Sequence, residues 1–144
     1  MILAIIQARM GATRLPGKVL LDLEGKLVLE RVIDRVKAAK LVDEVMVATT
    51  SNEKDKPIVA FCNKIGIKVF AGSEDDVLDR YYQAALEVKP DHVVRITADC
   101  PLMDPNVIDA VIKRHLDKTA DYTANIIEAV RRGLPCRRHR RTGR

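Results

Sequence analysis

The stretch ILAIIQARMGATRLPGKVL, residues 2–20, changes character in its middle. Residues 2–6 form a short run of apolar and β-branched residues, which predicts a buried strand. The part that follows packs two arginines, a lysine, two glycines and a proline into about a dozen positions. Because ligands of α/β proteins bind beyond the carboxyl ends of the strands, a basic loop at this place indicates a binding site.

The chain has the size and composition of one globular domain. It has 144 residues, 47% of them hydrophobic, which is enough to bury a core. The apolar run at its start is too short for a membrane span, and no basic region precedes it, so we expect neither a signal peptide nor a membrane partner. Cys62, Cys100 and Cys136 are far apart and lack C-x-x-C spacing. This favours a reduced, cytoplasmic setting over a disulfide framework or a zinc site.

The formal net charge of +5 comes from the C-terminal residues. Residues 131–144 contain seven arginines and neither lysine nor acidic residues, whereas residues 1–130 contain slightly more acidic than basic residues. We therefore divide the chain into a folded body, residues 1–130, and an Arg-rich tail, residues 131–144, which we expect to be disordered.

Strand-like and helix-like segments alternate along the body. Apolar, β-branched runs predict strands at residues 2–6, 45–50, 67–71 and 92–97. Helical spacing gives three apolar stripes: Leu29, Val32, Ile33 and Val36; Val77, Leu78, Tyr81, Tyr82 and Ala85; and Val107, Ile108, Val111 and Ile112. Residues 54–65 predict a further helix, and Asp104 followed by Pro105 is typical of a helix start. This alternation predicts an α/β fold with a parallel sheet and right-handed crossovers.

Small, polar or charged residues follow every predicted strand. They occupy residues 7–9, 49–51, 71–73 and 97–99. Because parallel strands end at the same edge of a sheet, these residues should lie together and form a site. The alternative interpretation is that strand ends are polar in any soluble protein, and the charged loop after the first strand favours the site.

The loop from Ala8 to Lys18 has the features of a phosphate-binding segment. Its glycines allow the backbone to approach a ligand closely, and successive N–H groups could form an anion nest. Arg9, Arg14 and Lys18 add three positive charges, which suit a triphosphate whose departing pyrophosphate must be neutralised. The alternative is a solvated basic loop with surface ion pairs, but the stiffening proline at residue 16 argues against it.

Two familiar nucleotide-binding patterns do not fit this loop. A P-loop requires four residues between its glycines and a Ser or Thr after the lysine. Here five residues separate Gly11 from Gly17, Val19 occupies the hydroxyl position, and no helix is predicted to start at once. The G-x-G-x-x-G pattern of dinucleotide-binding proteins is missing after the first strand as well.

Asp99 is the candidate metal ligand. It leaves the fourth predicted strand and is followed by Pro101, which fixes the turn. A carboxylate at a strand end near a phosphate-binding loop can hold Mg²⁺ between itself and the phosphates. A turn-forming aspartate before proline is the alternative. We interpret Asp104 as a helix cap and Cys100 as a spectator thiol, because no histidine is placed to activate it.

The segment GSEDDVLDRYYQAA, residues 72–85, begins with a helix start. Asp75 or Asp76 is the expected cap, and Arg80 lies one turn into the helix, where it could reach a nucleotide at the strand ends. The alternative for Arg80 is a surface ion pair with Asp76 at i,i+4 spacing.

Four ordered motifs resemble one family. They are AIIQARMGATRLPGKVLLDLEGKLVLERVIDRV, VMVATTS, GSEDDVLDRYYQAA and RITADCPLMDP, and they cover about residues 1–125. The chain is similar to the cytidylyltransferases, above all those of the spore-coat-polysaccharide type, which are related to the CMP-sialic acid and CMP-Kdo synthetases. The resemblance implies a Rossmann-like, three-layer αβα fold of the nucleotide-diphospho-sugar transferase (GT-A-like) kind.

The resemblance also implies an activity and a set of site residues. The activity is Mg²⁺-dependent transfer of CMP from CTP to a sugar hydroxyl, with release of pyrophosphate and no covalent enzyme intermediate. The sugar would be nonulosonic-acid-like or another surface-polysaccharide precursor. By resemblance, the triphosphate ligands would be Arg9, Gly11, Arg14 and Lys18, with Arg14 and Lys18 catalytic, and the metal ligand would be Asp99. The residues lining the cytidine would be Ala8, Thr49, Ser51, Arg80 and Thr97.

The resemblance ends near the C-terminus. Residues 133–135, GLP, are family-like, but CRRHRRTGR after them has no apolar periodicity. We interpret this change as the product of a frameshift or a truncation, which an uninterrupted family-like continuation in another frame of the coding DNA would support. The sheet is then incomplete at its C-terminal side, and an open edge favours a homodimer. A chain with such an incomplete sheet could still bind the nucleotide without transferring CMP to a sugar.

Two other functions remain open on the sequence alone. The Arg-rich tail could make salt-dependent contacts with nucleic acid, but the chain lacks stacking aromatics and a recognition helix, so nucleic acid is the less favoured partner. The chain could also be an inactive remnant that folds without turning over substrate.

Overall fold

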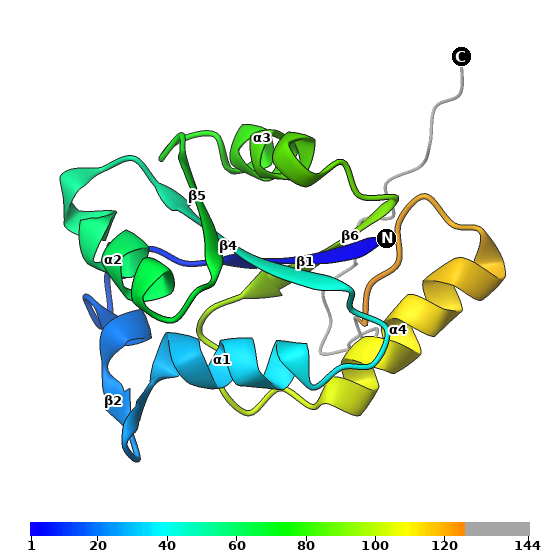
Figure 1. The fold of residues 1–144 in the computed structure, drawn as a ribbon, viewed down its shortest axis with the longest axis horizontal. Coiled ribbons are helices and arrows are strands. Elements are labelled where there is room, and N and C mark those ends of the chain that lie inside the picture. Colours follow the sequence, from blue (N-terminus) through cyan, green and yellow to red (C-terminus); the bar gives the residue numbers. More distant parts are fainter. Residues whose placement is uncertain (126–144) are drawn as a thin grey trace, which may run out of the picture.

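The computed structural model describes residues 1–125 of the chain. The predicted tail, residues 131–144, and the last residues of the predicted body lie outside the described part. Within it, helices cover both faces of a central sheet (Figure 1).

The central sheet has four parallel strands in the order β5-β4-β1-β6. Their bounds are β1 Ile2–Gln7, β4 Glu44–Thr50, β5 Lys68–Gly72 and β6 His92–Thr97. Each of the four predicted strands is present, with no end displaced by more than one residue. The parallel sheet expected from the alternation of elements is therefore confirmed.

In residues 1–125, four α-helices connect or follow the strands. They are α1 Val28–Lys37, α2 Lys56–Lys64, α3 Val77–Val88 and α4 Pro105–Lys118. The expected caps are confirmed: the Asp76 side chain accepts a hydrogen bond from the Asp79 N–H, and the Asp104 side chain accepts one from the Asn106 N–H, both at 2.8 Å. A side-chain oxygen at this position satisfies a backbone donor that the helix itself cannot pair.

The helices divide unequally between the two faces of the sheet. Helix α3 lies on one face, and α1, α2 and α4 lie on the other (Figure 1). Strand β1 is buried on both sides, with Leu3 and Ile5 in the cluster under α3 and with Ala4 and Ile6 in the cluster under the other helices. This explains why β1 reads as a continuous apolar run rather than an alternating one. The three-layer αβα arrangement is confirmed.

A short hairpin between β1 and α1 was not predicted. It pairs β2, Asp22–Leu23, with β3, Lys26–Leu27, after a short 3₁₀ turn, η1, Lys18–Leu20. Its turn residues Glu24 and Gly25 have φ angles of 53° and 80°, which is the conformation of a two-residue hairpin turn. No helix was expected directly after the loop, and the 3₁₀ turn η1 shows that this expectation is wrong.

Helix α3 buries only part of the predicted stripe: Tyr81 and Ala85 pack against the core cluster under the helix, as expected. Leu78 and Tyr82 are 80% and 59% exposed, whereas Arg80 and Ala84 are fully buried. Residues 80 and 84 are spaced like residues 78 and 82, so both pairs form a stripe at helical period. The buried face therefore combines Tyr81 and Ala85 of the predicted stripe with Arg80 and Ala84, and so includes an arginine that hydropathy alone would leave out.

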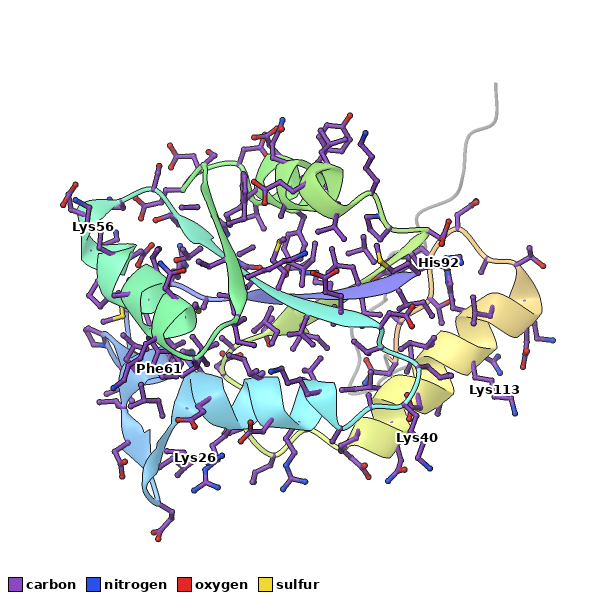
Figure 2. The ribbon with its side chains drawn as sticks, in the orientation of Figure 1. Lys26, Lys40, Lys56, Phe61, His92 and Lys113 are labelled. Carbon is purple, nitrogen blue, oxygen red and sulfur yellow. The ribbon has the colours of Figure 1, made fainter. Side chains whose placement is uncertain are left out.

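The lysines labelled in Figure 2 lie at the periphery of the molecule. The labelled lysines Lys26, Lys40, Lys56 and Lys113 point away from the layers, and side chains fill the space between sheet and helices (Figure 2). In the part of the chain that the structure describes, no helix combines the length and the apolar character needed to cross a bilayer.

The strand order creates a crevice at the carboxyl ends of β1 and β6. The chain moves outward from β1 to β4 and β5, and it then returns to place β6 on the other side of β1. At such a reversal the connections on the two sides of β1 diverge and leave room for a ligand.

Candidate active site

A cavity of about 530 Å³ opens at the crevice between the ends of β1 and β6. It contains five residues that the sequence singled out, namely Arg9, Arg14, Lys18, Thr97 and Asp99. The rest of its lining consists of Gln7, Ala12, Thr13, Leu15, Val19, Arg95 and Ala98. The loop after β1 thus forms one wall of the cavity, and the end of β6 forms the other.

The lining of the cavity is strongly basic. Arg9, Arg14, Lys18 and Arg95 face a single carboxylate, that of Asp99. Arg95 was not singled out from the sequence, although it lies two residues before Thr97 and so on the same face of β6. Its guanidinium lies 5.6 Å from the centre of the Tyr81 ring, a cation–π contact that holds it over the sheet. Such an excess of positive charge suits a polyanionic ligand.

Lys18 and Asp99 are paired across the cavity. The Lys18 Nζ atom donates to the Asp99 Oδ2 atom at 2.7 Å. This hydrogen bond, with a second from Thr97, lowers the pKa of the Asp99 carboxyl below its ordinary value, so the group is ionised near neutral pH. The two residues expected to serve phosphate and metal therefore neutralise each other in the free protein.

The loop after β1 is held in one shape by Met10 and Gly17. The Met10 carbonyl accepts hydrogen bonds from the Ala12 and Gly17 N–H groups, each at 2.9 Å. Gly17 has a φ of 69°, a left-handed conformation that favours glycine. Gly11 has another role, since a Cβ at its position would lie 3.3 Å from the Lys54 Nζ atom. The first glycine thus leaves room for a lysine of the protein itself.

The other predicted site residues lie at the same edge of the sheet but not in the lining of the cavity. They are Ala8, Gly11, Thr49, Ser51 and Arg80. Ala8 is buried and its N–H extends the sheet to the Ala48 carbonyl, while Ser51 is exposed and its N–H donates to the Gly72 carbonyl at 2.8 Å.

Thr49 and Arg80 carry polar atoms that are buried and unpaired. Both residues are 0% exposed, and the Thr49 Oγ1, Arg80 Nε and Arg80 Nη2 atoms lack a hydrogen-bond partner among the described residues. The Arg80 Nη1 atom donates to the Ser73 carbonyl, and burial lowers the pKa of the guanidinium. The alternative of a surface ion pair with Asp76 is wrong, because Arg80 points into the protein. Buried donors without partners are rare and mark places where a ligand can complete the hydrogen bonding.

Asp99 fits the role of a single protein ligand to Mg²⁺. In residues 1–125 no group of three or more His, Cys, Asp or Glu side chains is placed to hold a metal ion. Magnesium is commonly bound by one or two carboxylates together with substrate phosphates, and so it does not require such a group. The ionised Asp99, 44% exposed at its side chain and next to a basic cavity, meets this requirement.

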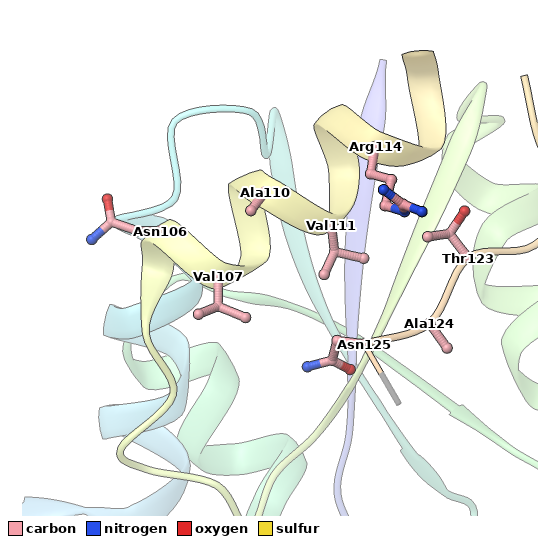
Figure 3. A pocket seen from close by; sticks show the side chains of 8 residues that line it. All are labelled: Asn106, Val107, Ala110, Val111, Arg114, Thr123, Ala124 and Asn125. Atoms are coloured by element: carbon pink, nitrogen blue, oxygen red, sulfur yellow. The ribbon is translucent and has the colours of Figure 1, made fainter. Parts of the chain in front are cut away.

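A second cavity, of about 380 Å³, lies between α4 and residues 123–125. Val107, Ala110 and Val111 of α4 form its apolar wall (Figure 3). Among the described residues that line it, Arg114 alone is charged. This cavity lacks the charge that a triphosphate requires, so we take the basic cavity as the candidate active site.

Comparison with known proteins places the chain among the nucleotidyltransferases. The sequence model of the cytidylyltransferase family matches residues 3–138. The spore coat polysaccharide biosynthesis protein SpsF of Bacillus subtilis is 44% identical over 126 residues, which are 85% of this chain and 52% of that protein. The chain spans about half the length of the curated relatives it matches.

Solved structures give the same result. A cytidylyltransferase from Leptospira borgpetersenii superposes with a TM-score of 0.76 at 38% identity, over 81% of this chain and 49% of that one. A CMP:2-keto-3-deoxy-manno-octonic acid synthetase complexed with CTP has a TM-score of 0.70 at 30% identity, over 83% of this chain and 48% of that one. The nucleotide-diphospho-sugar transferase type of fold agrees with these similarities. Fold, sequence motifs and basic cavity together assign this chain to the cytidylyltransferase family.

Proposed function

We propose that this chain binds CTP in the basic cavity and contributes to transfer of CMP to a sugar hydroxyl, with release of pyrophosphate. The observation that carries the proposal is the cavity itself, in which four cationic side chains and one carboxylate converge at the carboxyl ends of β1 and β6. The assignment of the chain to the cytidylyltransferases supports the choice of CTP over other polyanions.

In this proposal the loop after β1 holds the triphosphate. Arg9, Gly11, Arg14 and Lys18 bind the phosphates, and Arg14 and Lys18 are the catalytic residues because they neutralise the charge that develops on the leaving pyrophosphate. Supporting this, Arg9, Arg14 and Lys18 line one cavity although nine positions separate the first from the last. Fixed cationic side chains stabilise such a charge without the reorganisation that water would require.

The cytidine is proposed to lie along the carboxyl edge of the sheet, between the end of β6 and the ends of β4 and β5. Ala8, Thr49, Ser51, Arg80 and Thr97 are the residues proposed to surround it. The unpaired donors of Arg80 and the unpaired hydroxyl of Thr49 support this part of the proposal, because a base presents carbonyl, ring-nitrogen and amino groups that could pair with them. A polar site completed only by the right base is also a source of specificity.

The proposed reaction is a direct displacement. The sugar hydroxyl oxygen forms a bond to the α-phosphorus of CTP, the bond from that phosphorus to the bridging oxygen of the β-phosphate breaks, and the hydroxyl proton passes to solvent. The protein's part is to align the two reactants and to neutralise charge. Asp99 is the residue proposed to hold Mg²⁺, which would supply further positive charge beside the phosphates.

The acceptor class is proposed from the relatives. SpsF is named for spore coat polysaccharide biosynthesis, and the CTP-bound structure is a CMP:2-keto-3-deoxy-manno-octonic acid synthetase. A surface-polysaccharide precursor, such as an acidic sugar related to the nonulosonic acids, is therefore the acceptor that we propose.

Calorimetric titration of the chain with CTP, UTP, GTP and ATP, each with and without Mg²⁺, tests the proposal. We expect CTP to bind more tightly than the other three nucleotides and Mg²⁺ to strengthen its binding. Equal affinity for all four would contradict the cytidine pocket, and binding of none would contradict the proposed function of the cavity.

A further inference from the structure

The buried side chain of Asp55 is not used by the helix that it precedes. Asp55 ends the 3₁₀ turn η2, Glu53–Asp55, and stands at the N-cap position of α2, yet its side chain makes no capping hydrogen bond there. An aspartate at this position ordinarily accepts a hydrogen bond from the first turn of its helix. The carboxyl group instead points toward the loop that follows β1, as its contacts show.

Both carboxyl oxygens of Asp55 are occupied. The Oδ1 atom accepts a hydrogen bond from the Met10 N–H at 2.7 Å, and the Oδ2 atom accepts one from the Thr50 hydroxyl. Asp55 is 0% exposed and Thr50 is 1% exposed, so the bond between them is buried, and the bond to Met10 is partly buried. Hydrogen bonds to a carboxyl group in such surroundings are strong and fix the donor closely.

Met10 connects Asp55 to the rest of the loop through hydrogen bonds. Its N–H is bound by Asp55, and its carbonyl accepts from the Gly17 N–H. Gly17 immediately precedes Lys18, the first residue of η1, and the Gly17 carbonyl accepts from the Leu20 N–H at 2.9 Å. A continuous set of hydrogen bonds therefore runs from Asp55 through Met10 and Gly17 to the turn that carries Lys18.

A second contact joins the same two segments. Lys54, next to Asp55, places its Nζ atom close to Gly11, next to Met10. The Lys54 Nζ atom also pairs with Glu74 at 2.6 Å, which fixes its position from the side of β5. Two consecutive residues of η2 thus lie beside two consecutive residues of the loop, and Asp55 is hydrogen-bonded to one of them.

We propose that Asp55 is a positioning residue for the triphosphate-binding loop, which it holds through the Met10 N–H in the shape that presents Arg14 and Lys18 to the cavity. The proposal rests on the proposed function of that loop. Both carboxyl oxygens of Asp55 are already engaged by Met10 and Thr50, so it acts through the backbone. Because well-placed charges depend on a fixed loop, loss of this hydrogen bond should weaken phosphate binding.

Three variants of the full chain test the proposal: Asp55→Ala, Asp55→Asn and Asp43→Ala. Asparagine keeps an acceptor oxygen for the Met10 N–H, whereas alanine removes it. Asp43 is the matched control, because its Oδ2 atom accepts from the Ile2 N–H at 2.6 Å at the opposite end of β1. Each variant is titrated with CTP and Mg²⁺ by calorimetry, and hydrogen exchange at the Met10 and Gly17 amides is followed by NMR without nucleotide.

We expect Asp55→Ala to raise the Kd for CTP by about tenfold or more, the effect of losing one hydrogen bond to a carboxyl group. Exchange at the Met10 and Gly17 amides should accelerate in the same variant. Asp55→Asn should restore both amide protection and affinity, and Asp43→Ala should leave the Kd at the wild-type value even if its thermal stability falls. If Asp55→Ala does not fold, Asp55→Ser, whose hydroxyl is too short to reach Met10, replaces it.

Unchanged amide exchange and unchanged affinity in Asp55→Ala would overturn the proposal. So would an Asp55→Asn variant as weak as Asp55→Ala, since the geometry of the acceptor would then not be what matters. If the wild-type chain binds no CTP, the proposed function fails, but amide exchange still decides whether Asp55 holds the loop.

Discussion

The Lys18 Nζ atom lies 2.7 Å from the Asp99 Oδ2 atom, although 81 positions separate the two residues in the sequence. The pair joins the loop after β1 to the end of β6, two strands that are neighbours in the sheet. It therefore bridges the two walls of the basic cavity and keeps both charges in place before a ligand arrives. A phosphate that binds Lys18 must then replace Asp99, and a metal ion that binds Asp99 must replace Lys18.

Replacing Lys18 should change the titration of Asp99. Lys18 is the largest cause of the lowered pKa of Asp99, so Lys18→Met should move that pKa up toward the ordinary value of an aspartate. A lowered pKa in the folded state stabilises the protein above the unfolded pKa, and this contribution is lost as the pH falls through the folded pKa. The stability difference between wild type and variant should therefore be largest near neutral pH and vanish once Asp99 is protonated in both.

NMR titration of the Asp99 carboxyl carbon measures this shift directly. Lys26→Met is the matched control, because the Lys26 Nζ atom pairs with Asp34 at 2.6 Å on the outer side of α1. The control should leave the Asp99 titration unaltered. An identical Asp99 pKa in wild type and Lys18→Met would show that the pair does not persist in solution.

Gly17→Ala should impair the cavity as well as the fold. Gly17 has a φ of 69°, and a Cβ at its position would lie 3.2 Å from the Met10 Cε atom. We expect a loss of stability of about 1 to 2 kcal/mol from the left-handed conformation, together with weaker binding of CTP because the loop must shift. Thermal unfolding and calorimetry measure the two effects.

Gly66→Ala separates backbone strain from the effect on the site. Gly66 has the same φ of 69°, but a Cβ there would meet nothing within 4 Å. It should lose similar stability and keep the wild-type affinity for CTP. Equal losses of affinity in the two variants would mean that the loop conformation is not specifically required.

The strands and most helices could be predicted from the sequence because their patterns admit one interpretation. The apolar run of β1 and the cap at Asp104 are local signals, and local structure follows them. Tyr81 and Ala85 of the predicted α3 stripe pack against the sheet, but the exposure of Leu78 and the burial of Arg80 could not be predicted. Only contact with the sheet fixes how the helix is rotated about its axis, and here it buries a charged residue.

The charged residues of the candidate site could be predicted from the sequence, but the hydrogen bonds that hold the loop in place could not. Arg9, Arg14 and Lys18 stand out because they follow a strand, and Asp99 stands out because it follows another. Asp55 gives no such signal, since a polar residue before a helix is adequately explained as a cap. Its contact with Met10 depends on how β1 and η2 meet in three dimensions, and a single sequence does not contain that information.

Arg80→Met should separate stability from nucleotide binding. The Arg80 side chain is buried with two of its donor nitrogens unpaired, so its removal relieves a desolvation penalty while it costs the hydrogen bond to the Ser73 carbonyl. We expect the free energy of unfolding to stay within about 1 kcal/mol of wild type and CTP binding to weaken by about tenfold or more. Chemical denaturation and calorimetry provide the two measurements.

Arg31→Met is the control for that substitution. The Arg31 guanidinium donates to the Leu23 and Glu24 carbonyls of the hairpin, so its loss should lower stability and leave CTP binding intact. Full CTP affinity in a folded Arg80→Met variant would contradict the assignment of Arg80 to the cytidine pocket.

The two cysteines of the described part should differ sharply in reactivity. Burial raises the pKa of the Cys62 thiol to about 11, whereas Cys100 is exposed and its Sγ atom lies 3.8 Å from the Asp99 Oδ1 atom. Because the thiolate is the reactive form, iodoacetamide at about pH 8 should alkylate Cys100 in the native protein and Cys62 only after unfolding. Mass spectrometry of the separate peptides measures each rate, and that of Cys136, which lies outside the described residues, is read independently.

CTP with Mg²⁺ should slow alkylation of Cys100, whereas Mg²⁺ alone should do so less. If CTP binds by calorimetry and leaves the Cys100 rate unchanged, the nucleotide does not reach the end of β6 and the metal-ligand role proposed for Asp99 is wrong.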